Sequence, residues 1–345
     1  MTDKSDKTDG NGWKVTKKQV LMVTMMVVVA FGAWQYAAMN AGFRSEKAAW
    51  VRIPANATVE QAKDSIISSL GEDFGSKVAR LWNGNIASSH GAYLIQPREK
   101  AWRVAKNIGQ GRQTPVKVTF NNVRTFDRLA ELLSSKMDFS KEDFLTDAAR
   151  IAAADTLTAE QMTVQFLPDT YEAYWSATTD ELIAKIRSNY ARFWTPERKD
   201  KAASIGLTPM QASILASIVE EETNRRDERP AIARLYLNRL HKGMPLQADP
   251  TVKFAWGDPT VRRITGDMLK IESPYNTYKT AGLPPGVIRL PEASTIDAVL
   301  NAPPHNYIYM CARPDGSGRH DFTADYSTHL RNAANYRKKT FSTKK

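Results

Sequence analysis

The sequence predicts an α+β protein with one N-terminal transmembrane helix, followed by regions in which helices and short strands are mixed. Three observations lead to this prediction: an uncharged apolar run at 20–38, strand-like and helix-like stretches that alternate between residues 48 and 120, and a mostly helical pattern from residue 125 onward. The 345 residues leave room for an anchor and about two folded domains.

The apolar run is the first of these features. Val20–Ala38 contains no charged residue, and a helix needs roughly 20 apolar residues to cross a bilayer. Trp34 and Tyr36 lie near one end, where aromatic side chains favour the membrane interface. We therefore expect a transmembrane helix at 20–40 that contacts the lipid bilayer. A cleaved signal peptide is the alternative, but no Ala-x-Ala site ends the run.

The charges before the run predict its orientation. Five lysines precede or begin it, against three aspartates: Lys4, Lys7, Lys14, Lys17 and Lys18. By the positive-inside rule, the tail 1–19 stays in the cytoplasm and everything after residue 40 is exported. The expected location is the inner (cytoplasmic) membrane, in a single pass, with the larger part of the chain on the periplasmic side.

The net charge of +11 comes from basic residues that are spread along the chain, without a run of five Lys or Arg. Such a dispersed excess suits an anionic membrane surface or an acidic cell-wall polymer, and export argues against nucleic acid as a partner. Cys311 is the one cysteine, so no intramolecular disulfide can form. The five histidines form no close metal-type pair, and no Gly-rich phosphate loop is present, so we expect neither a metal nor a cofactor.

Short strands and helices alternate after the anchor. Ala48–Pro54 and Gly91–Ile95 are strand-like, and Thr58 caps a helical pattern between them. A second helical stretch follows, and Val116–Phe120 then alternates like a half-buried strand. We expect these elements to form one small α+β module at residues 41–124.

The middle of the chain is mostly helical and polar, from Thr125 to Ala191. Pro168 interrupts this pattern, because proline lacks the backbone N–H and its ring clashes with the preceding turn. We expect a helical connecting region at 125–200 and a separate α+β domain at 201–345.

A long amphipathic helix is predicted to begin at Thr208 and to break at Pro230. Thr208 supplies a capping hydroxyl, and Pro209 suits the first helical position. On a helical wheel four apolar residues share one face: Met210, Ile214, Leu215 and Ile218.

Three consecutive carboxylates follow on this helix. Glu222 falls within the apolar stripe, whereas Glu221 lies at its margin and Glu220 almost opposite. Apolar surroundings disfavour the ionised form of a carboxyl, so its pKa rises and it can hold a proton near neutral pH. Such a group can protonate a leaving oxygen, as cleavage of a glycosidic bond requires. The alternative is a solvated helix on which Glu222 pairs with one of three nearby arginines: Arg225, Arg226 and Arg229.

The loops after this helix are rich in Gly, Pro, Asn and Thr and carry polar and aromatic side chains. The candidates for binding a neutral sugar, which needs hydroxyl partners and an apolar ring face, are Gln247, Asp249, Tyr275, Asn276 and Thr277. Purely structural turns are the alternative. His320 is a further candidate, the alternative being a capped or solvent-facing ring.

Taken together, these motifs resemble the YceG-like (MltG) family of membrane-anchored endolytic murein transglycosylases. The matching runs stand in the family's order: Phe166–Tyr171 (FLPDTY), Ala216–Thr223 (ASIVEEET), Ala233–Val252 (ARLYLNRLHKGMPLQADPTV), Ser273–Tyr278 (SPYNTY), Gly282–Gly286 (GLPPG), Gly318–Asp325 (GRHDFTAD) and His329.

The resemblance implies a lytic cut between N-acetylmuramic acid and N-acetylglucosamine within peptidoglycan glycan strands, leaving a 1,6-anhydro muramyl end and limiting the length of nascent strands. It makes Glu222 the catalytic acid and Glu220 a supporting residue, within the family's E-x-E-T motif. The five loop candidates and His320 would line the sugar cleft of a catalytic domain at 201–345. Peptidoglycan synthases or division proteins would be possible partners.

The resemblance also extends to the N-terminal module, which looks like the family's LysM-like subdomain through Val51–Ala62 (VRIPANATVEQA) and Gly91–Pro97 (GAYLIQP). One departure follows the last strand, where relatives carry an EG-x-[TR] turn and this chain has Asn121-Asn122-Val123-Arg124-Thr125. Asn tolerates positive φ, so the turn can still form. A non-enzymatic scaffold that binds peptidoglycan is the competing function.

Overall fold

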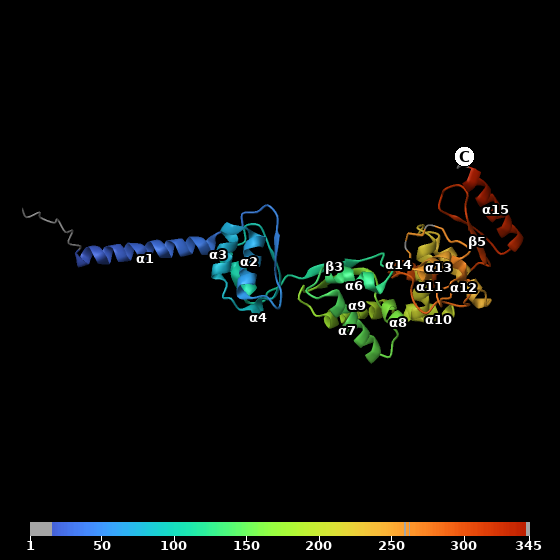
Figure 1. Ribbon diagram of the computed structural model, residues 1–345, viewed down its shortest axis with the longest axis horizontal. Coiled ribbons are helices and arrows are strands. Elements are labelled where there is room, and N and C mark those ends of the chain that lie inside the picture. The colour runs from blue at the N-terminus through green and yellow to red at the C-terminus, as the bar shows by residue number, and fades with distance from the viewer. Residues whose placement is uncertain (1–15, 259, 262, 343–345) are drawn as a thin grey trace, which may run out of the picture. The chain divides into compact units, whose positions relative to one another are not determined.

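The computed structural model describes residues 16–258, 260–261 and 263–342, and the chain divides into two compact units, Met1–Thr114 and Pro115–Lys345 (Figure 1). The predicted mixture of helices and short strands behind an N-terminal apolar helix is confirmed. Three of the lysines used to predict the orientation, Lys4, Lys7 and Lys14, lie outside the described residues.

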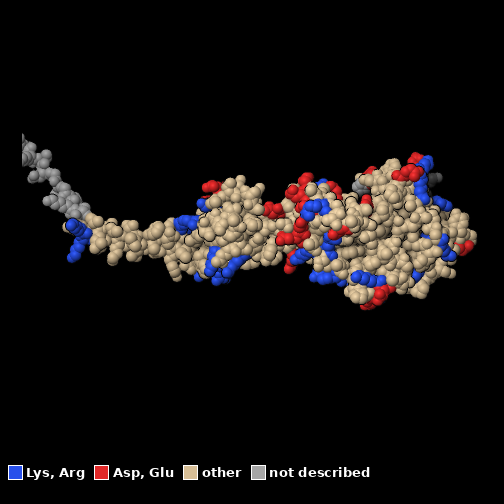
Figure 2. Space-filling view, turned by 90° about the horizontal axis from the view of Figure 1, so that it is seen from below, with Lys and Arg blue, Asp and Glu red and all other residues tan. Residues whose placement is uncertain are grey.

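The first unit begins with α1 (Lys17–Asn40), the one described helix that is long and apolar enough to cross a membrane. Thr16 caps it in a capping box with Gln19, and no charged residue follows Lys18 within the helix (Figure 2). Its apolar side chains are exposed, as they would be towards lipid, until Ala38 becomes buried against the rest of the same unit. A bilayer rather than protein is the environment that suits this surface.

The rest of the first unit is a small module in which three helices lie between two strands and a fourth helix follows. β1 (Ala49–Ile53) pairs antiparallel with β2 (Gly91–Ile95), and the connection contains α2, α3 and α4. The helices are α2 (Val59–Leu70), α3 (Glu72–Leu81), α4 (Ile86–Ser89) and α5 (Ala101–Gly109). The predicted cap at Thr58 is confirmed, since its hydroxyl accepts from the backbone N–H of Gln61.

The predicted third strand of this module belongs elsewhere. β3 (Val116–Phe120) pairs antiparallel with β4 (Asp169–Ala173), in the second unit, and the chain divides after Thr114. The prediction that β3 completes a module ending at residue 124 is therefore wrong for this strand. Its alternation of buried and exposed residues suits either partner, and β4 covers its apolar face with Tyr171, which stacks on Phe120.

The second unit continues as the predicted run of helices, broken once. The helices are α6 (Phe126–Ser134), α7 (Lys141–Ala154), α8 (Ala159–Val164), α9 (Thr179–Phe193) and α10 (Pro196–Ser204). The break falls where Pro168 predicted it, between α8 and α9, and β4 occupies it.

The hydrophobic core of the second unit is built around α11 (Pro209–Glu222), α12 (Arg229–His241) and α14 (Ala293–Leu300). Thr208 caps α11 as predicted, but the helix ends at Glu222 and not at Pro230. Pro230 instead lies in the first turn of α12, where its missing N–H costs nothing. Residues 223–228 thus separate the two helices and leave Glu222 at a helix end.

Four short elements and one longer helix complete this unit. They are α13 (Asp249–Trp256), the 3₁₀ helix η1 (Met268–Lys270), β5 (Tyr309–Ala312), β6 (His320–Thr323) and α15 (Tyr326–Ser342). β5 and β6 form an antiparallel pair, and α13 packs against α11 near the end that carries Glu222. The loops around α13 and η1 hold most of the predicted binding residues.

Candidate active site

Glu222 lies at the C-terminal end of α11, and its carboxylate Oε1 accepts a hydrogen bond of 2.6 Å from the hydroxyl of Tyr236. Tyr236 is buried in α12 and is 1% exposed, so the donor is held in place by the core. Glu222 itself is only partly buried. One side of the carboxyl is thus fixed by a phenol, and the group keeps some access from outside.

The environment expected for Glu222 is confirmed. The pKa of its carboxyl is raised to about 7, mainly by burial and to a smaller extent by the negative charge of Asp249. The hydrogen bond from Tyr236 and the charge of Lys253 act in the opposite direction, because both stabilise the carboxylate. The carboxyl therefore exchanges its proton near neutral pH, which is where a group that both donates and accepts a proton works best.

A second carboxyl–phenol pair lies beside the first. The hydroxyl of Tyr278 donates a 2.6 Å hydrogen bond to Oδ1 of Asp249, at the start of α13. Burial and the neighbouring Asp249 raise the pKa of Tyr278 well above its ordinary value. The negative charge of Asp249 raises the pKa of Glu222, and the charge of Glu222 raises the pKa of Tyr278. The two carboxyls and the two phenols therefore form one electrostatically coupled group, the Glu222 cluster.

Arg239 connects this cluster to the loop before α13. It lies one helical turn after Tyr236 on α12 and is 8% exposed. Its guanidinium donates to the backbone oxygen of Leu246 at 2.8 Å and to the side-chain oxygen of Gln247 at 2.9 Å. Gln247 has a left-handed backbone, with φ of 51°, so these contacts hold a strained turn in place.

Two of the other predicted binding residues are buried inside the loops. The side-chain amide of Asn276 donates to the backbone oxygens of Leu269 and Ile271, both at 2.9 Å. The hydroxyl of Thr277 accepts from the backbone N–H of Ala248 at 3.0 Å. Both side chains are at most 1% exposed, so in this geometry they hold the loops that present Gln247 and Asp249.

The remaining two predicted binding residues have partners outside the cluster. Tyr275 packs against Phe254, with ring centroids 4.8 Å apart. His320 lies on β6, where its Nδ1 is 2.9 Å from a carboxylate oxygen of Glu228. Neither has a described contact with Glu222. The structure places Asp249 near enough to raise the pKa of Glu222 and links Gln247 to α12 through Arg239, but it does not bring the whole predicted set together.

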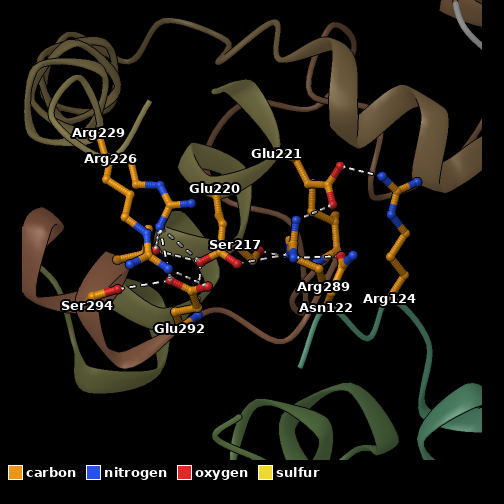
Figure 3. A network of polar contacts seen from close by, with 12 residues as sticks. Asn122, Arg124, Ser217, Glu220, Glu221, Arg226, Arg229, Arg289, Glu292 and Ser294 are labelled. Atoms are coloured by element: carbon orange, nitrogen blue, oxygen red, sulfur yellow. Dashed lines mark hydrogen bonds and ion pairs between the residues drawn. The ribbon is translucent and has the colours of Figure 1, made fainter. Parts of the chain in front are cut away.

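Glu220 is more deeply buried than Glu222, contrary to the helical wheel. Its side chain is 2% exposed, with Oε1 3.2 Å from Nε of Arg289 and Oε2 3.8 Å from Nη1 of Arg229. Oε2 also accepts from the backbone N–H of Glu292 at 2.9 Å and from the hydroxyl of Thr295 at 2.5 Å (Figure 3). The wheel failed because α11 is covered on every side, and two arginines compensate the charge.

Glu221 extends the same network to the turn after β3. Its two oxygens accept from Arg124 at 2.7 Å and from Arg289 at 3.0 Å, and Arg289 also donates to Asn122 at 2.7 Å (Figure 3). Asn122 has φ of 50°, so the predicted tolerance of Asn for positive φ in this turn is confirmed. Glu220 and Glu221 are thus tied to arginines, whereas Glu222 is held by a phenol.

Three residues of the cluster were missed as site candidates: Tyr236, Arg239 and Tyr278. Tyr236 and Arg239 are three residues apart in α12, a spacing that places both on one face. Polar side chains on a buried helix face need hydrogen-bond partners, so this pair could have indicated a polar site at this face of the helix. Tyr278 ends a predicted motif, but nothing local indicates that it reaches Asp249.

The fold and the site define an α+β protein with a candidate N-terminal membrane helix and, at the end of α11, an acid whose pKa is raised by burial. Within the described residues no group of three or more His, Cys, Asp and Glu side chains could hold a metal ion. Residues 51–335 match the YceG-like family, and this chain belongs to that family.

Two kinds of relatives accompany this match. The endolytic murein transglycosylase of Bacillus subtilis (strain 168) is 38% identical over 134 residues, which cover 39% of this chain and 36% of that protein. The endolytic murein transglycosylase of Streptococcus pneumoniae serotype 2 (strain D39) is 28% identical over 177 residues, which cover 49% and 31%. The chain thus matches about a third of the length of these relatives. A crystal structure of a YceG-like protein from Listeria monocytogenes shares the fold, with a TM-score of 0.55 and 23% identity over 83% of this chain and 99% of that one.

The hydrogen bond from Tyr236 is expected to lower the pKa of Glu222, and removing it tests this. Tyr236→Phe removes a donor that stabilises the carboxylate, so the pKa of Glu222 is expected to rise above its wild-type value of about 7. The measurement is an NMR titration of the full chain in detergent with ¹³C-labelled glutamate. Tyr307→Phe, which changes an exposed ring, is the matched control. A pKa that falls or stays constant in Tyr236→Phe would contradict this assignment.

Proposed function

We propose that this protein is a lytic transglycosylase that cleaves the bond between N-acetylmuramic acid and N-acetylglucosamine within peptidoglycan strands, with Glu222 as its acid. The observation that carries the proposal is the carboxyl of Glu222, desolvated at a helix end and holding its proton near neutral pH. The murein transglycosylase names of the relatives support the substrate class.

The mechanism needs one acid and no water. The protonated carboxyl of Glu222 gives its proton to the bridging oxygen, and the bond from this oxygen to C1 of the muramic acid breaks. The 6-hydroxyl of the same sugar then attacks the positively charged C1, and its proton returns to the carboxylate of Glu222. The product is a 1,6-anhydro end, and the second carboxylate that a hydrolase uses to activate water is not required.

The neighbouring groups have supporting roles in this scheme. Tyr236 orients the carboxyl of Glu222, because its hydroxyl donates to one oxygen and leaves the other for the substrate. The carboxylate of Asp249 favours positive charge at C1, since opposite charges attract strongly in a desolvated site. Gln247, steadied by Arg239, offers its amide to sugar hydroxyls. Tyr275 and His320 are proposed to bind further along the strand.

The anchor supports a location at the membrane. We propose that α1 crosses the inner membrane once with the tail 1–19 in the cytoplasm, since Lys17 and Lys18 stand at its start. The LysM-like subdomain and the catalytic domain at 201–345 would then meet nascent strands at the outer surface of this membrane. An endolytic cut there limits strand length. The same location places the protein close to peptidoglycan synthases and division proteins.

Product analysis tests the reaction. The full chain in detergent is incubated with purified glycan strands, and the ends are identified by mass spectrometry. We expect internal fragments whose muramyl ends lack one water relative to hydrolysis products. Reducing muramyl ends would indicate a hydrolase, and uncut strands that nevertheless bind the protein would favour the non-enzymatic scaffold.

A further inference from the structure

A cavity lies next to the Glu222 cluster, within the second unit. Its volume is about 560 Å³, and it is formed where the turn after β3 and the start of α6 face α13 and the segment after it. Its apolar lining comes from four residues: Pro250, Phe254, Val261 and Ile288. The mechanism above does not use this cavity, although it is large enough for a short peptide.

Cationic side chains outnumber anionic ones in the lining of the cavity. Arg124, Arg128 and Lys253 contribute to it, against Glu221 and Asp258. Both oxygens of Glu221 are already engaged by arginines, one of which, Arg289, is not itself a lining residue. An anion entering the cavity therefore meets an excess of positive charge.

Arg128 is the cation best placed to exchange partners. Its side chain is 64% exposed, and its described ion pair is with Glu131, one turn away on the same helix. Exposed pairs of this kind contribute about 0–1 kcal/mol, so a ligand carboxylate can compete for the guanidinium at little cost. The guanidinium fork matches a carboxylate with two parallel hydrogen bonds.

Two residues that line the cavity are sequence neighbours of the carboxyls in the Glu222 cluster. Glu221 lines the cavity and precedes Glu222, and Pro250 lines it and follows Asp249. A neutral sugar ring would be matched by amides and exposed aromatic faces, whereas this lining combines aliphatic groups with guanidinium and ammonium groups. An occupant with methyl groups, an aliphatic chain and free carboxylates fits it better.

We propose that this cavity binds the peptide stem of the muramic acid whose glycosidic bond is cut, with Arg128 and Arg124 as partners of its carboxylates. This inference rests on the proposed function and adds a specificity site to it. The chemistry of the substrate explains the position: the stem leaves from C3 of the same ring whose C1 is attacked, so it must emerge a few bonds from the carboxyl of Glu222. Strands that retain their stems are then preferred to strands stripped by an amidase.

Binding of defined fragments tests this proposal separately from turnover. The full chain carrying Glu222→Gln is titrated calorimetrically with three disaccharide probes: one with its peptide stem, one with the stem carboxylates amidated, and one without a stem. We expect the stem-bearing probe to bind most tightly. Adding Arg128→Glu should weaken it about tenfold, the loss of one carboxylate–guanidinium contact, and bring it close to the amidated probe.

Two further variants exclude indirect effects. Val261→Trp fills the cavity without changing charge and should weaken both stem-bearing probes relative to the stem-free one. Arg192→Glu, an equal charge change at an exposed site on α9, should leave the ratios of the three affinities unchanged. Equal affinities for the three probes, or ratios that Arg128→Glu and Val261→Trp both leave intact, would overturn the stem site. Failure to form anhydro ends in the product analysis would instead overturn the transglycosylase, whatever the fragments bind.

Discussion

Replacing Glu222 with glutamine is expected to lower the rate of anhydro-end formation by a factor on the order of 10²–10⁴, the usual contribution of a positioned general acid–base. Glutamine keeps the size of the side chain and an oxygen that can accept from Tyr236, but it has no proton to give. The loss is therefore expected in kcat, with KM changed little, because binding of the glycan does not depend on this proton.

The control for this variant is Glu272→Gln, an identical change in the same unit at a side chain that is 87% exposed. It is expected to retain wild-type activity. Wild-type kcat should fall as the pH rises through about 7, since the acid form of Glu222 is then lost. Full activity in Glu222→Gln would show that another group is the acid.

The same substitution should stabilise the protein at alkaline pH. The pKa of Glu222 is about 7 in the folded chain and ordinarily about 4.5, so between these values the folded state binds the extra proton. The free energy of unfolding of the wild type therefore falls as the pH rises through this window, by on the order of 1–3 kcal/mol. A glutamine at this position does not ionise, so it does not cause this pH-dependent loss of stability. Glu222→Gln should thus unfold at a higher denaturant concentration than the wild type at pH 8, and at a similar one at pH 4.

Features that depend on neighbours along the chain were predictable. The caps at Thr58 and Thr208 are bonds between residues three apart, and Pro168 acts on its own turn of backbone, so each follows from a few letters of sequence. The uncharged run of α1 is similarly local. None of these predictions requires knowledge of what packs against the element.

Features that depend on residues far apart in the sequence could not be predicted. The alternation of β3 predicts a strand with one buried face, but nothing in it distinguishes β2 from β4 as the partner. The wheel for α11 assumes one face in water, and that assumption placed Glu220 outside although Arg289, far along the chain, covers it. For Glu222 the wheel's apolar placement agrees with the burial that raises the pKa of its carboxyl, and α11 ends at this residue.

The largest expected effect on stability belongs to Glu220. Replacing it with leucine removes the carboxylate from between Arg229 and Arg289, whose side chains are 9% and 14% exposed. Each arginine keeps one other carboxylate, Glu292 for Arg229 and Glu221 for Arg289. Removing one partner from a buried ion pair still costs up to about 3–5 kcal/mol, and the backbone N–H of Glu292 and the hydroxyl of Thr295 also lose their acceptor. Glu221→Leu is the matched control and should cost less, because its partner Arg124 is 47% exposed and can turn to water, while Arg289 keeps Glu220.

Hydrogen exchange of the full chain can locate this loss. The carboxylate of Glu220 ties the last turn of α11 to the start of α14, so peptides covering residues 287–300 should exchange faster in Glu220→Leu, while those covering β1 and β2 should not change. The position of Glu222 depends on the same turn of α11, so activity should fall together with the protection of these amides. This loss is expected although the side chain of Glu220 is too deeply buried to contact a substrate. Unchanged exchange at residues 287–300 with activity lost would mean that Glu220 acts on the substrate itself, and the two-arginine network would not be what positions the acid.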